Sequence, residues 1–343
     1  MNDDLIPMAP EEGVDRFLSH RAPKWRDTTY QNAVHRMNVF LDWCEEAGIN
    51  DLNDLTGRDL SDFVAWRRDD VAPITLQKQL STPRVFLRWA ANTDAVREGL
   101  AEKLQAPELP DGAESSDAVI EPERVKEILR YLDRHDYASR LHAMAAILWR
   151  TGMRRGALHS LDVEDLRPGE DSLVLRHRPD EGTKLKNGAD GERWVYLGPR
   201  WYQIVADYVD DRRIGATDEY GREPLLTTRN GRPHKGTITD NCYRISRTCE
   251  MTGECPIGRD VEECRGTRDA VYCPVKKGPH AWRRAAISEH LRLGTDPDVV
   301  SERMNVSLKV LYRHYDVRTD REKMSVRKDS IPNQHNDVTH YDD

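Results

Sequence analysis

The stretch Thr151-Gly-Met-Arg-Arg-Gly-Ala-Leu158 lies where one apolar helix is predicted to end and a new segment to begin. Upstream of it, Met144, Ile147 and Leu148 recur at helical spacing, which predicts a helix over residues 138–150. Taken alone, its two adjacent arginines are most simply surface charges. The stretch gains meaning from two further strings that follow it along the chain.

These two strings, near the C-terminus, carry polar groups of a different kind. Pro279-His-Ala-Trp-Arg-Arg284 places His280 and Arg283 three residues apart, and so on one face of a helix predicted over 280–293. Leu311-Tyr-Arg-His-Tyr-Asp316 holds two tyrosines behind a helical stretch, where tyrosines by default are amphipathic packing residues. Each string alone is a weak signal, but their order and separation along the chain are specific.

Together the strings make the chain resemble the tyrosine recombinases, the phage-integrase family, and most of all its archaeal integrase-like and Xer-like members. The catalytic domain of that family carries a Thr-Gly-x-Arg box, a lysine on a hairpin, a His-x-x-Arg helix and a C-terminal tyrosine. All four parts occur here in that order. Residues 10–105 resemble the core-binding domain of the family, a small helical bundle whose last helix is rich in Phe and Trp. The resemblance therefore covers nearly the whole chain.

The predicted fold class is mainly α with a small β-hairpin or sheet (α+β), in two domains. A Pro, Gly, Ser and acid-rich stretch marks the linker between them. The predicted parts are a helical core-binding (SAM-like) domain over 1–104, a linker over 105–118, a catalytic domain over 119–328 with a Cys-rich insert at about 242–275, and a disordered tail over 329–343.

In the first domain the pattern predicts helices only. One covers residues 28–46 and begins with a capping box of Thr28 and Gln31. Thr56 is predicted to cap the next helix, and Pro83 to start or kink a third.

In the second domain the pattern predicts a β-hairpin between helices. Its strands cover residues 172–178 and 193–197 and are joined by a long polar tip. Further helices are predicted over 121–134, 138–150, 199–212, 237–249, 280–293 and 296–314.

The chemistry that the resemblance implies explains the residue types. In-line attack on a phosphodiester builds negative charge on the non-bridging oxygens, which two guanidinium groups stabilise, and Arg154 and Arg283 fit that role. A phenol is a weak nucleophile at neutral pH and needs a base, for which His280 is placed. A lysine on the hairpin, Lys186, protonates the leaving 5′-oxygen, and Tyr315 is the nucleophile. No metal or nucleotide cofactor is expected for this step.

Two of these assignments have a competitor. Lys184 and Lys186 alternate to the same face of a strand, and we favour Lys186 because it is nearer the Asn-Gly turn signal at the hairpin tip. Tyr312 competes with Tyr315 for the nucleophile. The family's spacing between histidine and tyrosine favours Tyr315, which lies 35 residues after His280, over Tyr312, which lies 32 residues after it.

The chain departs from the family pattern at two positions. Ala157 stands where the family usually has a glutamate, and Val306, beside Asn305, stands where it usually has a histidine or tryptophan. A second hydrogen-bond donor to the phosphate is therefore missing or supplied by another residue. The alternative function is a catalytically degenerate recombinase-fold protein that binds DNA without cutting it.

The composition neither demands nor forbids a DNA partner. The net charge is -8, yet 40 of the 52 basic residues are Arg, which binds phosphate bidentately. No stretch approaches the roughly 20 apolar residues of a membrane span. The N-terminus lacks the basic and apolar regions of a signal peptide, which favours a cytoplasmic protein. The resemblance implies double-stranded DNA as partner and self-assembly to a tetramer on DNA.

Five of the six cysteines fall between residues 242 and 273. In a cytosolic protein such clustering indicates metal more often than disulfides. Cys249, Cys255, Cys264 and Cys273 are the candidate ligands of a structural Zn²⁺, with free thiols, an iron–sulfur cluster or a disulfide as alternatives.

Overall fold

We describe a computed structural model of the chain that covers residues 5–108, 119–247 and 249–315, with Arg321, Met324 and Lys328 beyond them. The tail predicted over 329–343 and most of the predicted linker lie outside the described residues. The chain divides into two compact units, residues 1–116 and 117–343. Each unit has its own buried apolar cluster.

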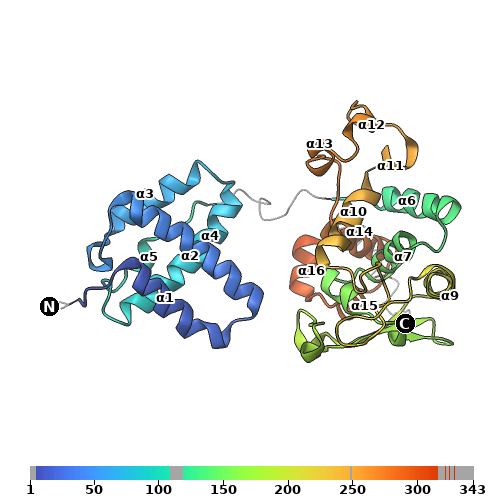
Figure 1. The fold of residues 1–343 in the computed structure, drawn as a ribbon, viewed down its shortest axis with the longest axis horizontal. Helices are drawn as coiled ribbons and strands as arrows, with labels where there is room; N and C mark the ends of the chain where they lie inside the picture. Colours follow the sequence, from blue (N-terminus) through green and yellow to red (C-terminus); the bar gives the residue numbers. More distant parts are fainter. Residues whose placement is uncertain are drawn as a thin grey trace, which may run out of the picture. The chain divides into compact units, whose positions relative to one another are not determined.

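The first unit is a helical bundle (Figure 1). Its helices are α1 (Pro10–Arg21), α2 (Asp27–Ala47), α3 (Gly57–Arg68), α4 (Pro73–Ala91) and α5 (Leu100–Lys103). Buried phenylalanines from four helices meet at its centre, and the rings of Phe17 and Phe86, for example, are 5.5 Å apart in an edge-on contact. The aromatic core holds α1, α2 and α4 together.

The helix ends of this unit test three predictions. Thr56 caps α3 in a capping box with Asp59, as predicted. The box of Thr28 and Gln31 is wrong, because α2 begins one residue earlier, at Asp27, and Arg26 makes no side-chain cap hydrogen bond. Pro83 starts no helix either: α4 begins at Pro73, and Pro83 lies buried within it.

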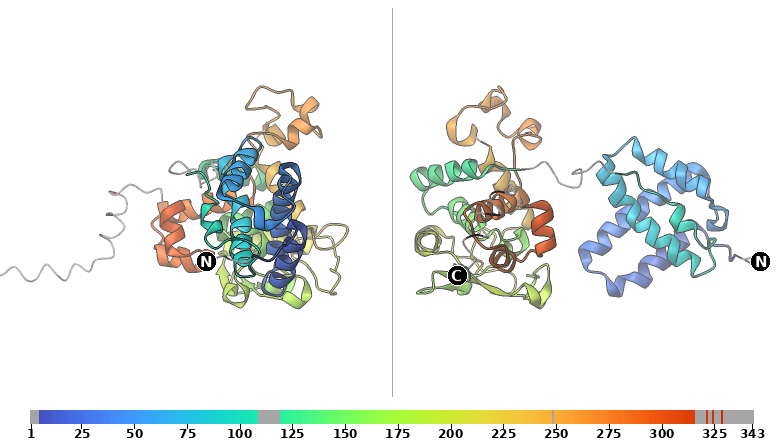
Figure 2. Two further views of the ribbon diagram at one scale, coloured as in Figure 1. Left: turned by 90° about the vertical axis from the view of Figure 1, so that its left-hand side faces the viewer. Right: turned by 180° about the vertical axis from the view of Figure 1, so that it is seen from behind.

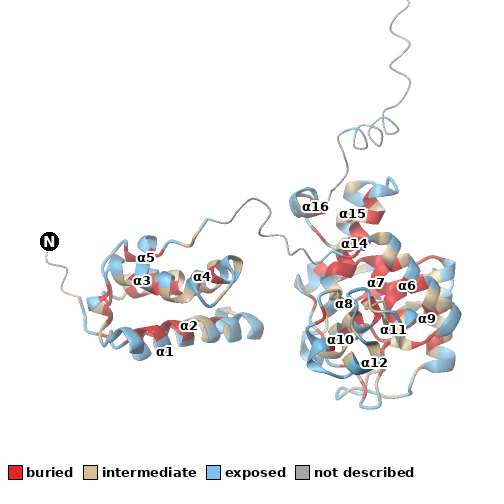
Figure 3. Ribbon diagram, turned by 90° about the horizontal axis from the view of Figure 1, so that it is seen from above, coloured by how far each residue is buried: buried red, intermediate tan, exposed pale blue. Residues whose placement is uncertain are grey.

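The second unit surrounds α7 (Arg140–Thr151), whose residues are nearly all buried. Helices α6 (Pro122–His135), α9 (Pro199–Asp207) and α14 (Pro279–Arg292) pack against it. Figure 3 shows the long buried stretches of α7 and α14. The remaining helices are α8 (Arg155–Ser160), α10 (Lys235–Ser246), α11 (Cys249–Thr252), α12 (Val261–Cys264), α13 (Arg268–Val271), α15 (Pro297–Met304) and α16 (Leu308–His314).

The predicted hairpin is part of a three-stranded antiparallel sheet in the order β1 (Leu166–Arg167), β2 (Ser172–Leu175), β3 (Arg193–Tyr196). Strand β1, too short for a periodic signal, was not predicted. The two-residue period also misplaced the lysines: Lys184 and Lys186 lie outside any strand, in the connection from β2 to β3.

The helix predicted over 296–314 is broken into α15 and α16. Asn305 adopts a left-handed conformation, φ 50 and ψ 61, which ends α15, and Ser307 begins α16. Asparagine tolerates this conformation better than most side chains do. The turn brings backbone carbonyls of α15 toward α14, which shapes the site described below.

A buried ion-pair network anchors the base of the β2–β3 connection. Asp162 is 1% exposed and lies 3.3 Å from guanidinium nitrogens of both Arg178 and Arg222, and it also pairs with Arg232. Arg178 reaches Asp165 at 2.7 Å as well. The connection is thus tied to the loop after α8 by charge as well as by backbone.

No helix among the described residues combines the length and the apolar character that crossing a bilayer requires.

Candidate active site

An open pocket of about 500 Å³ lies at the start of α14. Its lining residues are Arg154, Arg155, Thr239, Tyr243, Lys276, Gly278, Pro279, His280, Ala281 and Arg283. Arg154, His280 and Arg283, three of the five residues predicted from sequence, therefore meet at one place. No acidic side chain is among the lining residues, so the pocket is cationic in a chain whose net charge is -8.

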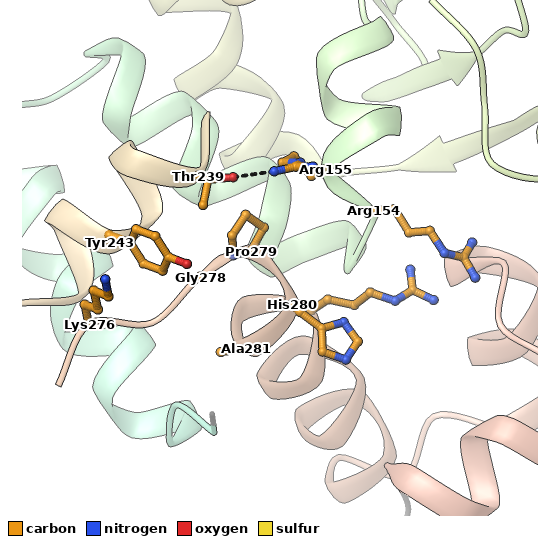
Figure 4. A pocket seen from close by; sticks show the side chains of 10 residues that line it. Arg154, Arg155, Thr239, Tyr243, Lys276, Gly278, Pro279, His280 and Ala281 are labelled. Carbon is orange, nitrogen blue, oxygen red and sulfur yellow. Dashed lines mark hydrogen bonds between the residues drawn. The ribbon is translucent and has the colours of Figure 1, made fainter. Parts of the chain in front are cut away.

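Arg154 reaches the pocket because of how α7 ends. Gly152 takes a left-handed φ of 55, and Arg154 is extended at the N-cap of α8. A Cβ on Gly152 would lie 2.7 Å from the sulfur of Met304, so only glycine permits this close approach to α15. In Figure 4 the side chains of Arg154 and His280 extend to the same side of α14, whereas Arg155 donates to Thr239.

Arg283 is buried at 3% exposure and holds three backbone carbonyls together. Its Nη1 donates to the carbonyls of Gly152 at 2.7 Å and Met304 at 2.8 Å, and its Nη2 to that of Asn305 at 3.5 Å. Burial, and then the charge of Arg154, lower its pKa to about 10, while Tyr315 acts in the opposite direction by charge and by a hydrogen bond. Arg283 therefore links its own helix to Gly152 of the first string and to the end of α15, and it keeps its charge at neutral pH.

His280 lines the pocket and is exposed to solvent. Partial loss of solvation, followed by the charges of Arg283, Arg284, Arg154 and Lys186, lowers its pKa. The imidazole is therefore neutral at physiological pH and can accept a proton. Its ring lies 6.5 Å from the ring of Tyr315, edge to face.

The two candidate tyrosines differ in their surroundings. Tyr315 is 6% exposed and adjoins Arg154, Arg283 and His280. Tyr312 is 53% exposed. The structure therefore brings Tyr315, and not Tyr312, together with the other predicted residues.

Lys186 is exposed and close enough for its charge to act on His280. Two hydrogen bonds position the β2–β3 connection, which contains Lys186. Asn187, next to Lys186, donates from Nδ2 to Oδ1 of Asn305 at 2.7 Å. Arg193, where β3 begins, donates from Nε to the carbonyl of Arg303 at 2.8 Å. Both links end on the last turn of α15 or just after it.

Sequence reasoning missed Arg193 and Arg303 as members of the site. Burial lowers the pKa of Arg193 to about 10, with further contributions from Arg283, Arg154 and Arg303. Arg303 donates to the carbonyl of Arg150 at 3.0 Å and also to that of Tyr196. No local pattern could have found these two arginines, because their partners lie far away in the chain.

The two departures from the family pattern both face inward. Val306 is 5% exposed and packs in an apolar cluster with Met304 and Leu311, and Ala157 is 8% exposed on α8. Neither side chain can donate a hydrogen bond to a phosphate.

Comparisons with known proteins agree on the fold. Residues 15–94 match the family model for the phage integrase N-terminal SAM-like domain. The integrase of transposon Tn1549, in a structure with circular intermediate DNA, is 14% identical with a TM-score of 0.71, over 94% of this chain and 100% of its own. Lambda integrase, as a dimer bound to a COC′ core site, is 13% identical with a TM-score of 0.64, over 92% and 98%.

A third structure covers the first unit only. The N-terminal domain of a phage integrase/site-specific recombinase from Haloarcula marismortui is 34% identical over 30% of this chain and 99% of its own, with a TM-score of 0.29. A comparison with curated proteins gave no significant match.

The fold is that of the tyrosine recombinases. Residues 15–94 match the phage integrase N-terminal SAM-like domain, and the chain as a whole resembles the tyrosine recombinase, or phage-integrase, family in its fold. The resemblance and the fold class predicted from sequence are both confirmed.

Proposed function

We propose that the chain is a site-specific DNA recombinase or integrase that cleaves and rejoins DNA through a 3′-phosphotyrosyl intermediate. The observation that carries the proposal is the convergence of Arg154, His280 and Arg283 on one pocket, with the ring of Tyr315 beside His280. The positive charges of the two arginines, a base and a nucleophile then surround one position that a DNA backbone phosphate can occupy.

In the proposed reaction Tyr315 Oη attacks the phosphorus while its proton passes to His280. The bond from phosphorus to the 5′-oxygen breaks, and that oxygen takes a proton from Lys186. Arg154 and Arg283 stabilise the charge that grows on the non-bridging oxygens. The products are a 3′-phosphotyrosyl link and a free 5′-hydroxyl, and a 5′-hydroxyl of a second strand reverses the steps. On this proposal, these residues perform all the reaction steps without a metal ion or a nucleotide cofactor.

The partner we propose is double-stranded DNA, on which the chain assembles to a tetramer in the cytoplasm. The cationic lining of the pocket supports a phosphate-bearing partner. The Tn1549 integrase is in complex with a circular intermediate DNA, and the lambda integrase dimer is bound to a COC′ core site.

The competing function is DNA binding without cleavage. It is favoured by Val306, which leaves the phosphate without a donor that the family usually has, and by Ala157, which replaces the usual glutamate. Loss of one such donor lowers the rate of comparable reactions by about 10²–10³. On our proposal the enzyme is therefore slow but active.

A covalent trapping assay separates the two functions. Duplexes are first selected from a random pool by their binding to the Tyr315→Phe protein. They are then nicked to make suicide substrates, so that the fragment bearing the released 5′-hydroxyl diffuses away after cleavage. We expect the wild-type protein and Tyr312→Phe to form a covalent adduct that survives denaturing electrophoresis, and Tyr315→Phe to form none. Specific binding with no adduct from the wild-type protein would establish that the chain binds DNA without cleaving it.

A further inference from the structure

The Cys-rich insert between α10 and α14 has little to hold it together. Its three helices, α11, α12 and α13, have four residues each, and they project from the body of the second unit (Figure 2). Among its described residues, 249–278, only Ala270 and Cys273 are buried. A segment that buries so little apolar surface needs a cross-link or a metal to fold stably.

Four cysteines of the insert line one small cavity, and they are Cys249, Cys255, Cys264 and Cys273. The cavity measures about 20 Å³, which is close to the roughly 10–15 Å³ that a single water-sized occupant needs. Cys249 lies within electrostatic range of both Cys255 and Cys273. All four thiols are free, so no disulfide joins the insert.

The wall of this cavity suits an anionic metal–thiolate centre. Arg247, Arg259 and Arg265 line it together with Glu250, and Arg247 pairs with Glu250 at 2.6 Å and Arg265 with Glu262 at 2.9 Å. Four thiolates around one divalent ion leave a net negative charge that the excess of guanidinium groups can balance. Arg247 and Arg259 are themselves held by the carbonyls of Ala270 and Asp269, at 3.3 and 3.1 Å. The cations are therefore fixed beside the sulfurs.

We propose that Cys249, Cys255, Cys264 and Cys273 together bind one structural Zn²⁺. Thiolate sulfur in a closed tetrahedral set is the donor type that Zn²⁺ takes in structural sites. As the side chains stand, no three His, Cys, Asp or Glu of the described residues already converge closely enough to hold an ion. Metal binding thus draws the four thiols inward around the cavity and closes the insert.

The metal site also fixes the approach to the pocket, an extension that rests on the proposed function. Residues 274–278 run from Cys273 directly to α14, and Lys276 and Gly278 line the pocket. Ser246 accepts from the backbone N–H of Lys277 at 2.7 Å, and the ammonium of Lys276 lies 4.6 Å from the ring centre of Tyr243. Anchoring Cys273 therefore positions the wall that leads to His280.

The first test is the metal content of the purified full-length chain, by plasma mass spectrometry. We expect about one zinc ion per chain, and loss of most of it in each single Cys→Ser variant of the four. Cys242→Ala is the matched control, because Cys242 lies on α10 with its side chain buried in the core, so the variant should keep the zinc. Protein without zinc, zinc retained when all four cysteines are replaced, or iron in place of zinc would overturn the proposal.

Cobalt substitution keeps the test valid where a Cys→Ser variant fails to fold. Co²⁺ bound by the wild-type chain should give the absorption bands of a tetrahedral thiolate site, and one equivalent of Zn²⁺ should abolish them. Octahedral Co²⁺ spectra would contradict the four-thiolate set.

The proposal that the metal site positions the approach to the pocket is tested separately. Chelation should reduce the covalent DNA adduct roughly tenfold, as loss of supporting interactions around a site commonly does, and Zn²⁺ should restore it. Stoichiometric zinc with no adduct at all would refute the proposed function and leave the metal site standing. An undiminished adduct from zinc-free protein would refute the bracing role alone.

Discussion

Two groups of arginines in the second unit differ in what surrounds them. The paired cluster consists of Arg178, Arg222 and Arg232 with Asp162, Asp165 and Asp218. The pocket cluster consists of Arg154, Arg193, Arg283 and Arg303, and the described part of the chain places no carboxylate in an ion pair with any of them.

The electrostatic consequences are opposite. In the paired cluster, burial works against the charge of Arg178, but hydrogen bonds and charge from Asp165 and its neighbours raise its pKa above the ordinary value. In the pocket cluster, burial lowers the pKa of Arg283 and Arg193 to about 10, and neighbouring arginines lower it further, an effect that Tyr315 opposes at Arg283. Carboxylates neutralise the arginines of the paired cluster, whereas no carboxylate of the described residues forms an ion pair with those of the pocket cluster.

The difference indicates which cluster serves the fold and which serves a ligand. Buried like charges are costly unless an opposite charge compensates them. A protein that keeps several such guanidinium groups together sacrifices stability in the free state. The sacrifice is explained if a DNA phosphate supplies the missing charge, as we propose.

The largest expected effect comes from breaking the paired cluster. Asp162→Ala leaves three guanidinium groups without their shared, buried carboxylate, which should lower the free energy of unfolding by about 3–5 kcal/mol. Urea unfolding followed by circular dichroism measures this loss. Glu219→Ala, in the nearby exposed loop, is the control and should change little. A loss of less than about 1 kcal/mol for Asp162→Ala would show that the network is not structural.

Removing a cation from the pocket cluster should do the reverse. Arg154→Ala is expected to slow formation of the covalent adduct by about 10²–10³, with no loss of unfolding free energy, because it relieves repulsion on Arg283. Arg200→Ala, an exposed arginine on α9 that pairs with Asp133 at 3.2 Å and does not line the pocket, is the matched control. Similar rates for the two variants would remove Arg154 from the proposed site.

The pocket cluster should also set the pH dependence of cleavage. Since partial loss of solvation, and then the neighbouring cations, lower the pKa of His280, the neutral base should persist below pH 6.5 and the rate should fall only at more acidic pH. Arg154→Gln removes one cation, so the pKa of His280 should rise and the acid limb of the rate profile should move to higher pH. An acid limb that Arg154→Gln leaves in place would argue against His280 as the base.

The smallest expected effect concerns the link that holds Lys186. Asn187→Ala removes the hydrogen bond to Asn305, which is worth about 0.5–1.5 kcal/mol, so the cleavage rate should fall roughly two- to tenfold. Unfolding free energy should stay nearly constant, since this hydrogen bond is exposed to solvent. Asn230→Ala, in a distant turn, should leave the rate unchanged, and an equal loss there would show that the effect is not local.

The sequence predicted the parts of the site that lie within short strings. Arg154, His280 and Arg283 follow from local motifs, and the spacing to Tyr315 selected the tyrosine that does adjoin them. The helix stop at Gly152 and the cap at Thr56 follow equally from local chemistry. Order and spacing along the chain were sufficient for these.

The rest depends on contacts between distant residues. Arg193 meets Arg303, and Asn187 meets Asn305, across more than a hundred residues of chain. Helical periodicity over 296–314 continued through Asn305, because a single left-handed residue leaves no mark in an apolar pattern. Local patterns therefore could not reveal Arg193 and Arg303, which lie behind the pocket lining, or the turn at Asn305.

The most direct test of the central claim is mass spectrometry of the trapped protein–DNA adduct after digestion with protease and nuclease. If the pocket cluster surrounds a phosphate that Tyr315 attacks, the peptide containing Tyr315 should carry the 3′-nucleotide on its phenol oxygen. A nucleotide on Tyr312, or on any other residue, would contradict the account.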